Sequence, residues 1–151
     1  MHGVISSSSE AKLLCKGEDD MNFLNKEHEL KFLEMKQNLP ERFLQDRERL
    51  AVIFLMAGNN ELCSKLEPYI DWNEGFFFDE MFEKEDFSSG IRVLAKLAVV
   101  LYNNGTSLEF IDLYRYLDQT NLKLALNAAN YRYNSKLSET YESRDTNSYL
   151  N

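Results

Sequence analysis

The pattern of apolar and polar positions is clearest between Ser88 and Gly105, in the stretch SSGIRVLAKLAVVLYNNG. Serine side chains at its start can accept hydrogen bonds from first-turn amides, and the Asn-Asn-Gly ending suits a left-handed stop. Between these signals apolar residues recur at helical spacing, and only Arg92 and Lys96 interrupt them, four apart on one face. The pattern predicts a helix from Ser88 to Asn104 that other helices surround, with one narrow edge in water. Its apolar positions include Ile91, Leu94, Leu97, Ala98 and Leu101.

Similar signals predict helices on both sides of this stretch. Each has a capping residue followed by apolar residues at helical spacing. The run at residues 50–57 is apolar throughout and also fits a buried strand, but its Leu, Met and Ala content and the stop at Gly58 favour a helix. The predicted helices are 25–40 (cap Asn25; buried side Leu30, Phe32, Leu33, Met35; end Pro40), 46–58 (cap Asp46), 60–68 (start Asn60; end Pro68), 107–117 (cap Ser107; apolar Leu108, Ile111, Leu113, Tyr114, Leu117) and 118–133 (cap Asp118 or Thr120).

These elements predict an all-α fold. We expect a single compact domain, residues 21–133, of about five to seven helices around the central buried helix at Ser88 to Asn104. Residues 1–20 lack apolar periodicity and are expected to form a disordered extension. Residues 134–151 are rich in Ser, Thr, Asn and Tyr and are expected to form a flexible tail. Residues 69–86 are predicted to be an irregular connection that contributes aromatic side chains to the core.

Composition narrows the function classes. The 151-residue chain carries a formal charge of -8, which repels a phosphate backbone, so nucleic-acid binding is disfavoured and a basic protein partner is favoured. Two distant cysteines, Cys15 and Cys63, indicate neither a disulfide framework nor a zinc site. No apolar run reaches the length of a membrane helix, and the start does not resemble an export signal. We therefore expect a cytoplasmic protein with no membrane contact.

From Met21 to about Tyr133 the sequence resembles a family of small proteins from Gram-positive bacteria and their mobile elements, the domain of unknown function 6075. The strings that carry the resemblance are MNFLNKEHELKF, DRERLAVIFLMAGNNELCSKL, SSGIRVLAKLAVVLYNNG and LDQTNLKLALNAANYRYN. The resemblance implies a helical domain in a bacterial or phage setting. It implies no activity, cofactor or catalytic residue, and residues 1–20 and the tail fall outside it.

Candidate polar chemistry is sparse. His28 lies between two glutamates, but neighbouring helix positions diverge by about 100 degrees, so those carboxylates do not share its face. No metal-binding histidine pair, nucleophile motif or glycine-rich phosphate loop occurs, so we predict no metal, cofactor or catalytic residue. The main polar cluster starts the second helix and is interpreted first as a capped, salt-bridged helix start and second as a pocket that grips a carboxylate or phosphate. It consists of Asp46, Arg47, Glu48 and Arg49.

Two further groups are candidates for binding. Asn59 is interpreted first as a turn or cap and second as a ligand contact. Trp72, Phe76 and Phe77 lie among acidic residues in the segment 69–86, where the alternative to core packing is an exposed acidic and aromatic patch that holds a partner.

Several functions remain open at this stage. The leading hypothesis is a protein–protein interaction or regulatory module of a bacterial or phage element, which binds another protein or a second copy of itself. One alternative is a ligand-binding protein or enzyme with a pocket near Asp46 to Arg49, which requires His28 and Arg49 to converge. Another is an acidic mimic of nucleic acid that acts against host defence, which requires carboxylates at phosphate-like spacing on one face.

Overall fold

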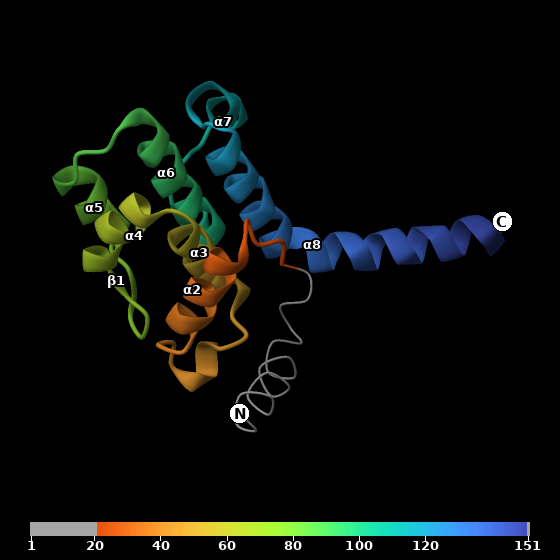
Figure 1. Cartoon of the computed structure of the whole chain (residues 1–151). Helices are drawn as coiled ribbons and strands as arrows, with labels where there is room; N and C mark the ends of the chain where they lie inside the picture. The colour runs from red at the N-terminus through yellow and green to blue at the C-terminus, as the bar shows by residue number, and fades with distance from the viewer. Residues whose placement is uncertain (1–20, 151) are drawn as a thin grey trace.

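The computed structural model describes the backbone of residues 21–150 and the side chains of residues 21–134. Seven α-helices, α2 to α8, lie in this part of the chain, with two short 3-10 turns and one small hairpin (Figure 1). The all-α class and the expected number of helices are therefore confirmed. The predicted extension at residues 1–20 lies outside the described residues.

The elements follow one another with short connections. The helices are α2 (Lys26–Lys36), α3 (Arg47–Gly58), α4 (Asn60–Leu66), α5 (Phe78–Lys84), α6 (Ser89–Asn103), α7 (Phe110–Tyr116) and α8 (Gln119–Leu150). The 3-10 turns are η2 (Glu41–Phe43) and η3 (Glu67–Tyr69). Strands β1 (Ile70–Asp71) and β2 (Gly75–Phe76) pair antiparallel, with Ile70 opposite Phe76 and Asp71 opposite Gly75.

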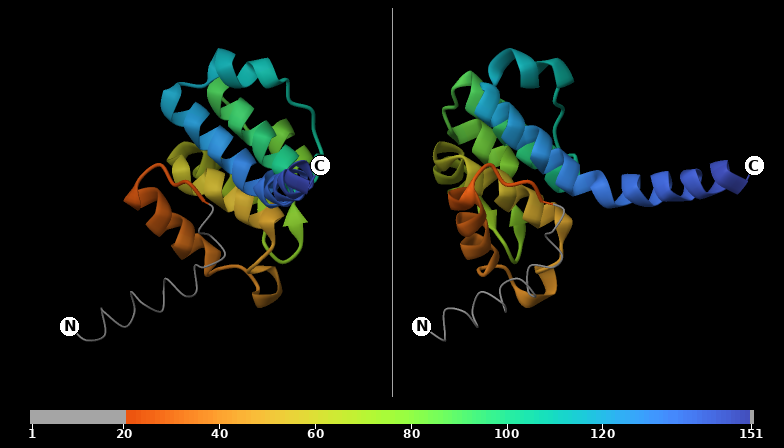
Figure 2. Two further views of the ribbon diagram at one scale, coloured as in Figure 1. Left: turned by 90° about the vertical axis from the view of Figure 1, so that its right-hand side faces the viewer. Right: turned by 45° about the vertical axis from the view of Figure 1, so that its right-hand side comes forward.

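Helix α3 is the element around which the others pack. All residues from Leu50 to Ala57 are buried, and α2, α4, α6 and α8 lie against it (Figures 1 and 2). A helix that is apolar on every side has to be enclosed in this way. Helix α6 is buried along its predicted apolar face, but it exposes Arg92 and half-exposes Lys96. The central helix is therefore α3, and the predicted centre at Ser88 to Asn104 forms one of its walls.

Most helix starts follow the predicted capping. Four side chains each accept a hydrogen bond from a first-turn amide: Asn25, Asp46, Ser88 and Asp118. Helix α4 begins at Asn60 and is capped by Asn59, as the first interpretation of Asn59 had it, through the Leu62 amide at 3.0 Å. Helix α6 ends at Asn104, which adopts the left-handed conformation with φ 56 that we had assigned to Gly105.

Two apolar faces were predicted wrongly. In α2 the buried line runs through His28, Phe32 and Lys36 at spacings of four, so Leu30 lies on the far side and is 56% exposed. Helix α7 begins at Phe110, without a side-chain cap, and not at Ser107. It buries Leu113 and leaves Ile111 and Tyr114 in solvent.

Helix α8 runs on to Leu150, and its C-terminal half projects away from the rest of the fold (Figures 1 and 2). Its first half packs against α3, α6 and α7. The backbone of residues 134–150 is thus helical, whereas the flexibility expected for this segment stays a prediction. Among residues 21–150, no helix combines the length and the apolar character that a membrane crossing requires.

Gly58 allows α3 and α8 to approach closely. A methyl group at this position would overlap the side chain of Leu124, which is fully buried and has no room to move into solvent. Helix propensity alone favours Ala over Gly by about 1 kcal/mol, but overpacking a filled core costs about 1–3 kcal/mol. We therefore expect Gly58→Ala to lower the free energy of unfolding, measured by urea denaturation.

A double-mutant cycle tests the cause of this loss. If the methyl group acts by crowding Leu124, Gly58→Ala combined with Leu124→Ala costs less than the sum of the single variants, by at least about 1 kcal/mol. Additive effects, or a Gly58→Ala variant that is more stable than the parent, would contradict the close approach.

Candidate functional site

His28 is enclosed between α2 and α3, and both of its ring nitrogens are engaged. The Leu24 amide donates to Nδ1 at 3.0 Å, so Nδ1 carries no proton. Nε2 therefore carries the proton and donates it to the Phe54 carbonyl oxygen at 2.8 Å. The ring also makes an edge contact with Phe54, with centroids 4.5 Å apart, and is only 3% exposed. His28 thus connects the entry of α2 to the middle of α3.

The environment of His28 keeps the imidazole neutral. Burial lowers the pKa of His28 below its usual value of 6.5, an effect that the hydrogen bond to the Phe54 carbonyl partly opposes. A second proton on Nδ1 would also face the Leu24 N–H group, a donor against a donor. With both nitrogens engaged inside the fold, His28 has no free nitrogen with which to act as a base or a metal ligand.

A surface pocket of about 200 Å³ opens beside His28. Its rim includes Glu27, Lys31 and Asn60, and the Lys31 amino group donates to the Asn60 side chain at 2.6 Å. Asn59, our candidate ligand contact, instead caps α4 and donates to the Asn121 side chain of α8 at 3.0 Å. Asn60 therefore connects the turn between α3 and α4 to α2, and Asn59 connects it to α8.

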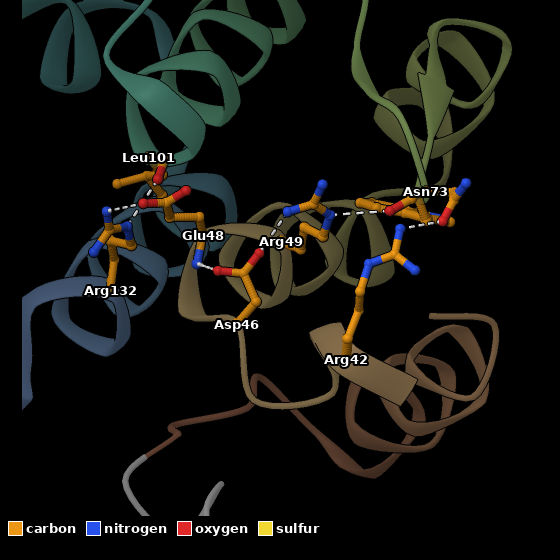
Figure 3. A network of polar contacts seen from close by, with 8 residues as sticks. Arg42, Asp46, Glu48, Arg49, Asn73, Leu101 and Arg132 are labelled. Carbon is orange, nitrogen blue, oxygen red and sulfur yellow. Dashed lines mark hydrogen bonds and ion pairs between the residues drawn. The ribbon is translucent and has the colours of Figure 1, made fainter. Parts of the chain in front are cut away.

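Arg49 of the cluster that begins α3 contacts several other residues (Figure 3). One guanidinium nitrogen lies 2.7 Å from the Asp46 carboxylate, and another donates to the Trp72 carbonyl oxygen at 3.0 Å. The guanidinium also lies over the Phe43 ring, 3.6 Å from its centre. Because its side chain is only 11% exposed, these contacts join α3 to η2 and to the hairpin in a partly dehydrated setting.

The other two charged residues of this cluster reach α8. Arg47 donates to the Tyr131 carbonyl oxygen, and its guanidinium lies 4.7 Å from the centre of the Tyr131 ring. Glu48 pairs with Arg132 at 3.4 Å, and Arg132 also donates to the Leu101 carbonyl oxygen at 2.8 Å (Figure 3). That carbonyl belongs to the last turn of α6, where no intrahelical amide is available to it. The cluster is a junction of α3, α6, α8 and the hairpin.

His28 and Arg49, whose convergence the ligand-binding alternative required, do not line a common pocket. The pocket beside His28 and the hollow beside Arg49 share no lining residue. The hollow, between α3 and the hairpin, is too tightly filled to admit a water molecule. The site on which the ligand-binding alternative depended is therefore not assembled, and the salt-bridged helix start is the arrangement observed.

The three aromatic candidates of the segment 69–86 lie in different environments. Phe76 is buried and makes an edge contact with Tyr102 of α6, centroids 5.9 Å apart. Trp72 is half-buried at the hairpin, and Phe77 is 53% exposed. The segment, which we expected to be irregular, contains the hairpin and α5. Of the three only Phe77 faces solvent, so core packing, the first interpretation, describes Phe76 and Trp72 better than the alternative of an exposed aromatic patch.

The exposed apolar surface lies instead on α7. Seven large apolar side chains of the described residues are well exposed, and four of them belong to this helix: Phe110, Ile111, Tyr114 and Tyr116. Phe110 is the most exposed at 67%, and its ring contacts that of Tyr114, centroids 5.5 Å apart. We call Phe110, Ile111 and Tyr114 the α7 surface. Ile111 and Tyr114 were predicted to lie in the core because they belong to a wide apolar arc with Leu113 and Leu117, of which only Leu113 and Leu117 are buried.

A cleft of about 270 Å³ separates α6 from α7, and we call it the α6–α7 cleft. Tyr116 lies on the α7 side of the cleft and not on the α7 surface, which occupies the opposite flank of the helix. The cleft is lined by Phe87, Ser89, Arg92, Val93, Lys96, Asp112 and Tyr116.

Comparison with known families gives a match over residues 18–146, to the Family of unknown function (DUF6075). The chain belongs to DUF6075. The match confirms the resemblance and extends it at both ends, because residues 18–20 and 134–146, which we had placed outside the family, are included. Comparisons of this DUF6075 member with curated proteins and with solved structures found no match.

Within the described residues of this DUF6075 member, no three His, Cys, Asp or Glu side chains come together in a way that could hold a metal ion. Cys63 is a free, buried thiol of α4, and burial raises the pKa of Cys63 above its usual value. A protonated thiol is a weak nucleophile. Cys15 lies outside the described residues.

Proposed function

We propose that this member of DUF6075 is a protein-binding module, an accessory or regulatory protein whose contact surface is the α7 surface. The observation that supports it is the exposure of Phe110, Ile111 and Tyr114, at 67%, 52% and 51%, on one short helix. Large apolar side chains gathered in this way typically mark an interaction site. Aromatic residues are also the side chains that most often dominate binding energy.

The α7 surface is well supported from behind. Leu113 of α7 and Leu117, which directly follows it, are buried in the core, and α7 packs against both α6 and α8. The contact between the Phe110 and Tyr114 rings holds the two side chains together before any partner arrives. A surface that is already ordered loses less side-chain entropy on binding than a flexible one.

Charge indicates the chemistry of the partner. Residues 109–118, which comprise α7 and its two flanks, carry Glu109, Asp112 and Asp118 against a single base, Arg115, so the surroundings of the α7 surface are acidic on balance. The whole chain has a formal charge of -8. A different protein, with an apolar patch bordered by Lys and Arg, complements this surface, whereas a second copy brings like charges together.

The experiment compares capture by three forms of the full chain. Phe110→Ser/Tyr114→Ser removes the α7 surface, and Leu30→Ser is the control because Leu30 is 56% exposed on α2. Thermal unfolding and circular dichroism establish that all three are folded. We expect one partner to be captured in stoichiometric amount by the parent and by Leu30→Ser, and at least tenfold less by the double variant.

Calorimetry with the purified partner then has to show the same difference in affinity between the three forms. The affinity is also expected to fall as the salt concentration increases. Equal capture by all three forms, or none by any, contradicts the proposal. Light scattering over a concentration series addresses the other occupant: dimerisation of the parent that the double variant loses would assign the α7 surface to a second copy.

A further inference from the structure

The α6–α7 cleft concentrates positive charge in an acidic protein. Ser89, Arg92, Val93 and Lys96 follow one face of α6 at spacings of three, one and three residues. Neither Arg92 nor Lys96 forms an ion pair with an acidic side chain of the described residues. The cleft thus places on one wall two cations without an acidic partner among the described residues, in a chain with 25 acidic and 17 basic side chains.

The opposite wall does not neutralise these cations. Asp112 is the one acidic residue in the lining, and it pairs with Arg115 of its own helix at 3.6 Å. Ser89 is the first residue of α6, so the cleft also begins at the positive end of a 15-residue helix dipole. The electrostatic character of the cleft therefore suits an anion.

The remaining lining is apolar and aromatic. Phe87, Val93 and Tyr116 all line the cleft, and the centre of the Phe87 ring lies 5.7 Å from the Arg92 guanidinium carbon. The guanidinium is thus held near an aromatic ring, as in sites that recognise planar anionic groups. A volume of about 270 Å³ is below the usual range for drug-sized ligands, so the occupant must be compact.

We propose that the α6–α7 cleft binds a small organic oxyanion, a carboxylate or phosphate attached to a single ring or short apolar group. Arg92 and Lys96 bind the oxyanion, and Phe87, Val93 and Tyr116 contact the apolar part. The site is separate from the α7 surface, because the two lie on opposite flanks of α7 and share no residue.

The test is a titration of the full chain, followed by amide chemical shifts. The probes are phenyl phosphate, benzoate and inorganic phosphate. We expect saturable shifts around Ser89, Arg92 and Tyr116 with phenyl phosphate or benzoate, at low-millimolar affinity or better. Inorganic phosphate is expected to bind at least threefold more weakly than phenyl phosphate, because it lacks the group that contacts Phe87 and Tyr116.

A charge-matched pair of variants separates the cleft from general attraction. Arg92→Gln/Lys96→Gln removes the two cations of the cleft and is expected to weaken binding at least tenfold. Lys84→Gln/Lys123→Gln removes the same charge from exposed positions outside the cleft and is expected to leave affinity within twofold. Thermal unfolding of both variants shows whether the fold is retained.

Three results would overturn the proposal. The first is the absence of saturable chemical-shift changes at probe concentrations up to about 20 millimolar, roughly the weakest affinity of interest. The second is that both double variants weaken probe binding equally. The third is equal affinity for inorganic phosphate and phenyl phosphate. The last result would show that the apolar wall takes no part. None of these results bears on the α7 surface, so the proposed function stands or falls separately.

Discussion

A His28→Ala variant is expected to lose about 2–4 kcal/mol of unfolding free energy, the combined cost of a cavity and an unpaired buried amide. The Leu24 N–H group loses its acceptor, and the Phe54 carbonyl loses one of its donors. The ring also fills the space between Phe23 and Phe54, with centroids 5.2 and 4.5 Å away. Urea denaturation at pH 7.5 measures the loss.

Two further variants separate the hydrogen bonds of His28. Asn can place an oxygen where Nδ1 lies and so retain the Leu24 bond, whereas Gln can place an N–H group near Nε2 and retain the Phe54 bond. We expect His28→Asn and His28→Gln each to be less destabilised than His28→Ala. A His28→Ala variant within about 0.5 kcal/mol of the parent, the range of ordinary surface changes, would show that the two bonds contribute little.

The same variants test the protonation of His28. Because burial lowers the pKa of His28 in the folded protein, the His28 imidazole takes up its second proton more readily in the unfolded chain as the pH falls below 6.5. The contribution of the neutral His28 ring to the free energy of unfolding is therefore complete above pH 6.5. It is lost as the pH falls, by at most about 1.4 kcal/mol per pH unit. The parent should lose more stability than the three variants between pH 7 and 5.5. Parallel pH profiles would contradict the assignment.

An Arg49→Met variant is expected to lose about 2–4 kcal/mol, because it removes one partner of a largely enclosed charge network. Methionine retains much of the apolar stem, but the Trp72 carbonyl and the Asp46 carboxylate each lose their contact with the guanidinium. The hairpin should then be held less tightly to α3. Trp72 is the one tryptophan of the chain, so its fluorescence reports this local change directly.

Arg42→Met is the matched control. Arg42 also lies against Phe43, at 4.5 Å, and donates to Asn73 of the same hairpin, but it is exposed. An exposed contact of this kind is worth about 0–1 kcal/mol, so Arg42→Met should change stability little. Arg49→Lys keeps the positive charge but not the planar guanidinium group, so its free energy of unfolding should lie between those of the parent and of Arg49→Met. Equal losses for Arg42→Met and Arg49→Met would remove the special role of Arg49.

The helices could be predicted from sequence because their signals are local. Asn25, Asp46 and Ser88 cap the helices they precede, and each helix continues into apolar residues. The predicted central helix, α6, is buried as expected, whereas the still more enclosed α3 was not singled out because α6 shows the cleaner pattern. An amphipathic helix such as α6 gives a clear periodicity, whereas α3, enclosed on all sides, is uniformly apolar and resembles a buried strand.

The proposed binding surfaces could not be predicted in this way, because they depend on contacts between residues that are distant in sequence. Arg92 and Lys96 were recognised as a solvent edge, but the opposite wall of their cleft comes from Asp112 and Tyr116 in another helix. His28 acquires its role from a carbonyl oxygen 26 residues away. The two-residue strands of the hairpin are too short for an alternation of apolar and polar positions to be visible.

The position of α8 against α3 has a consequence for biosynthesis. The ribosome makes α2, α3 and α6 before α8, so a nascent chain that ends before residue 119 leaves one side of α3 uncovered. The Leu101 carbonyl oxygen also lacks its hydrogen bond from Arg132 until α8 is made, and the Asn22 carbonyl oxygen lacks its hydrogen bond from the Asn127 side chain. The native core can therefore be completed only after α8 has been translated. Until then the apolar helix α3 is incompletely covered and prone to aggregation.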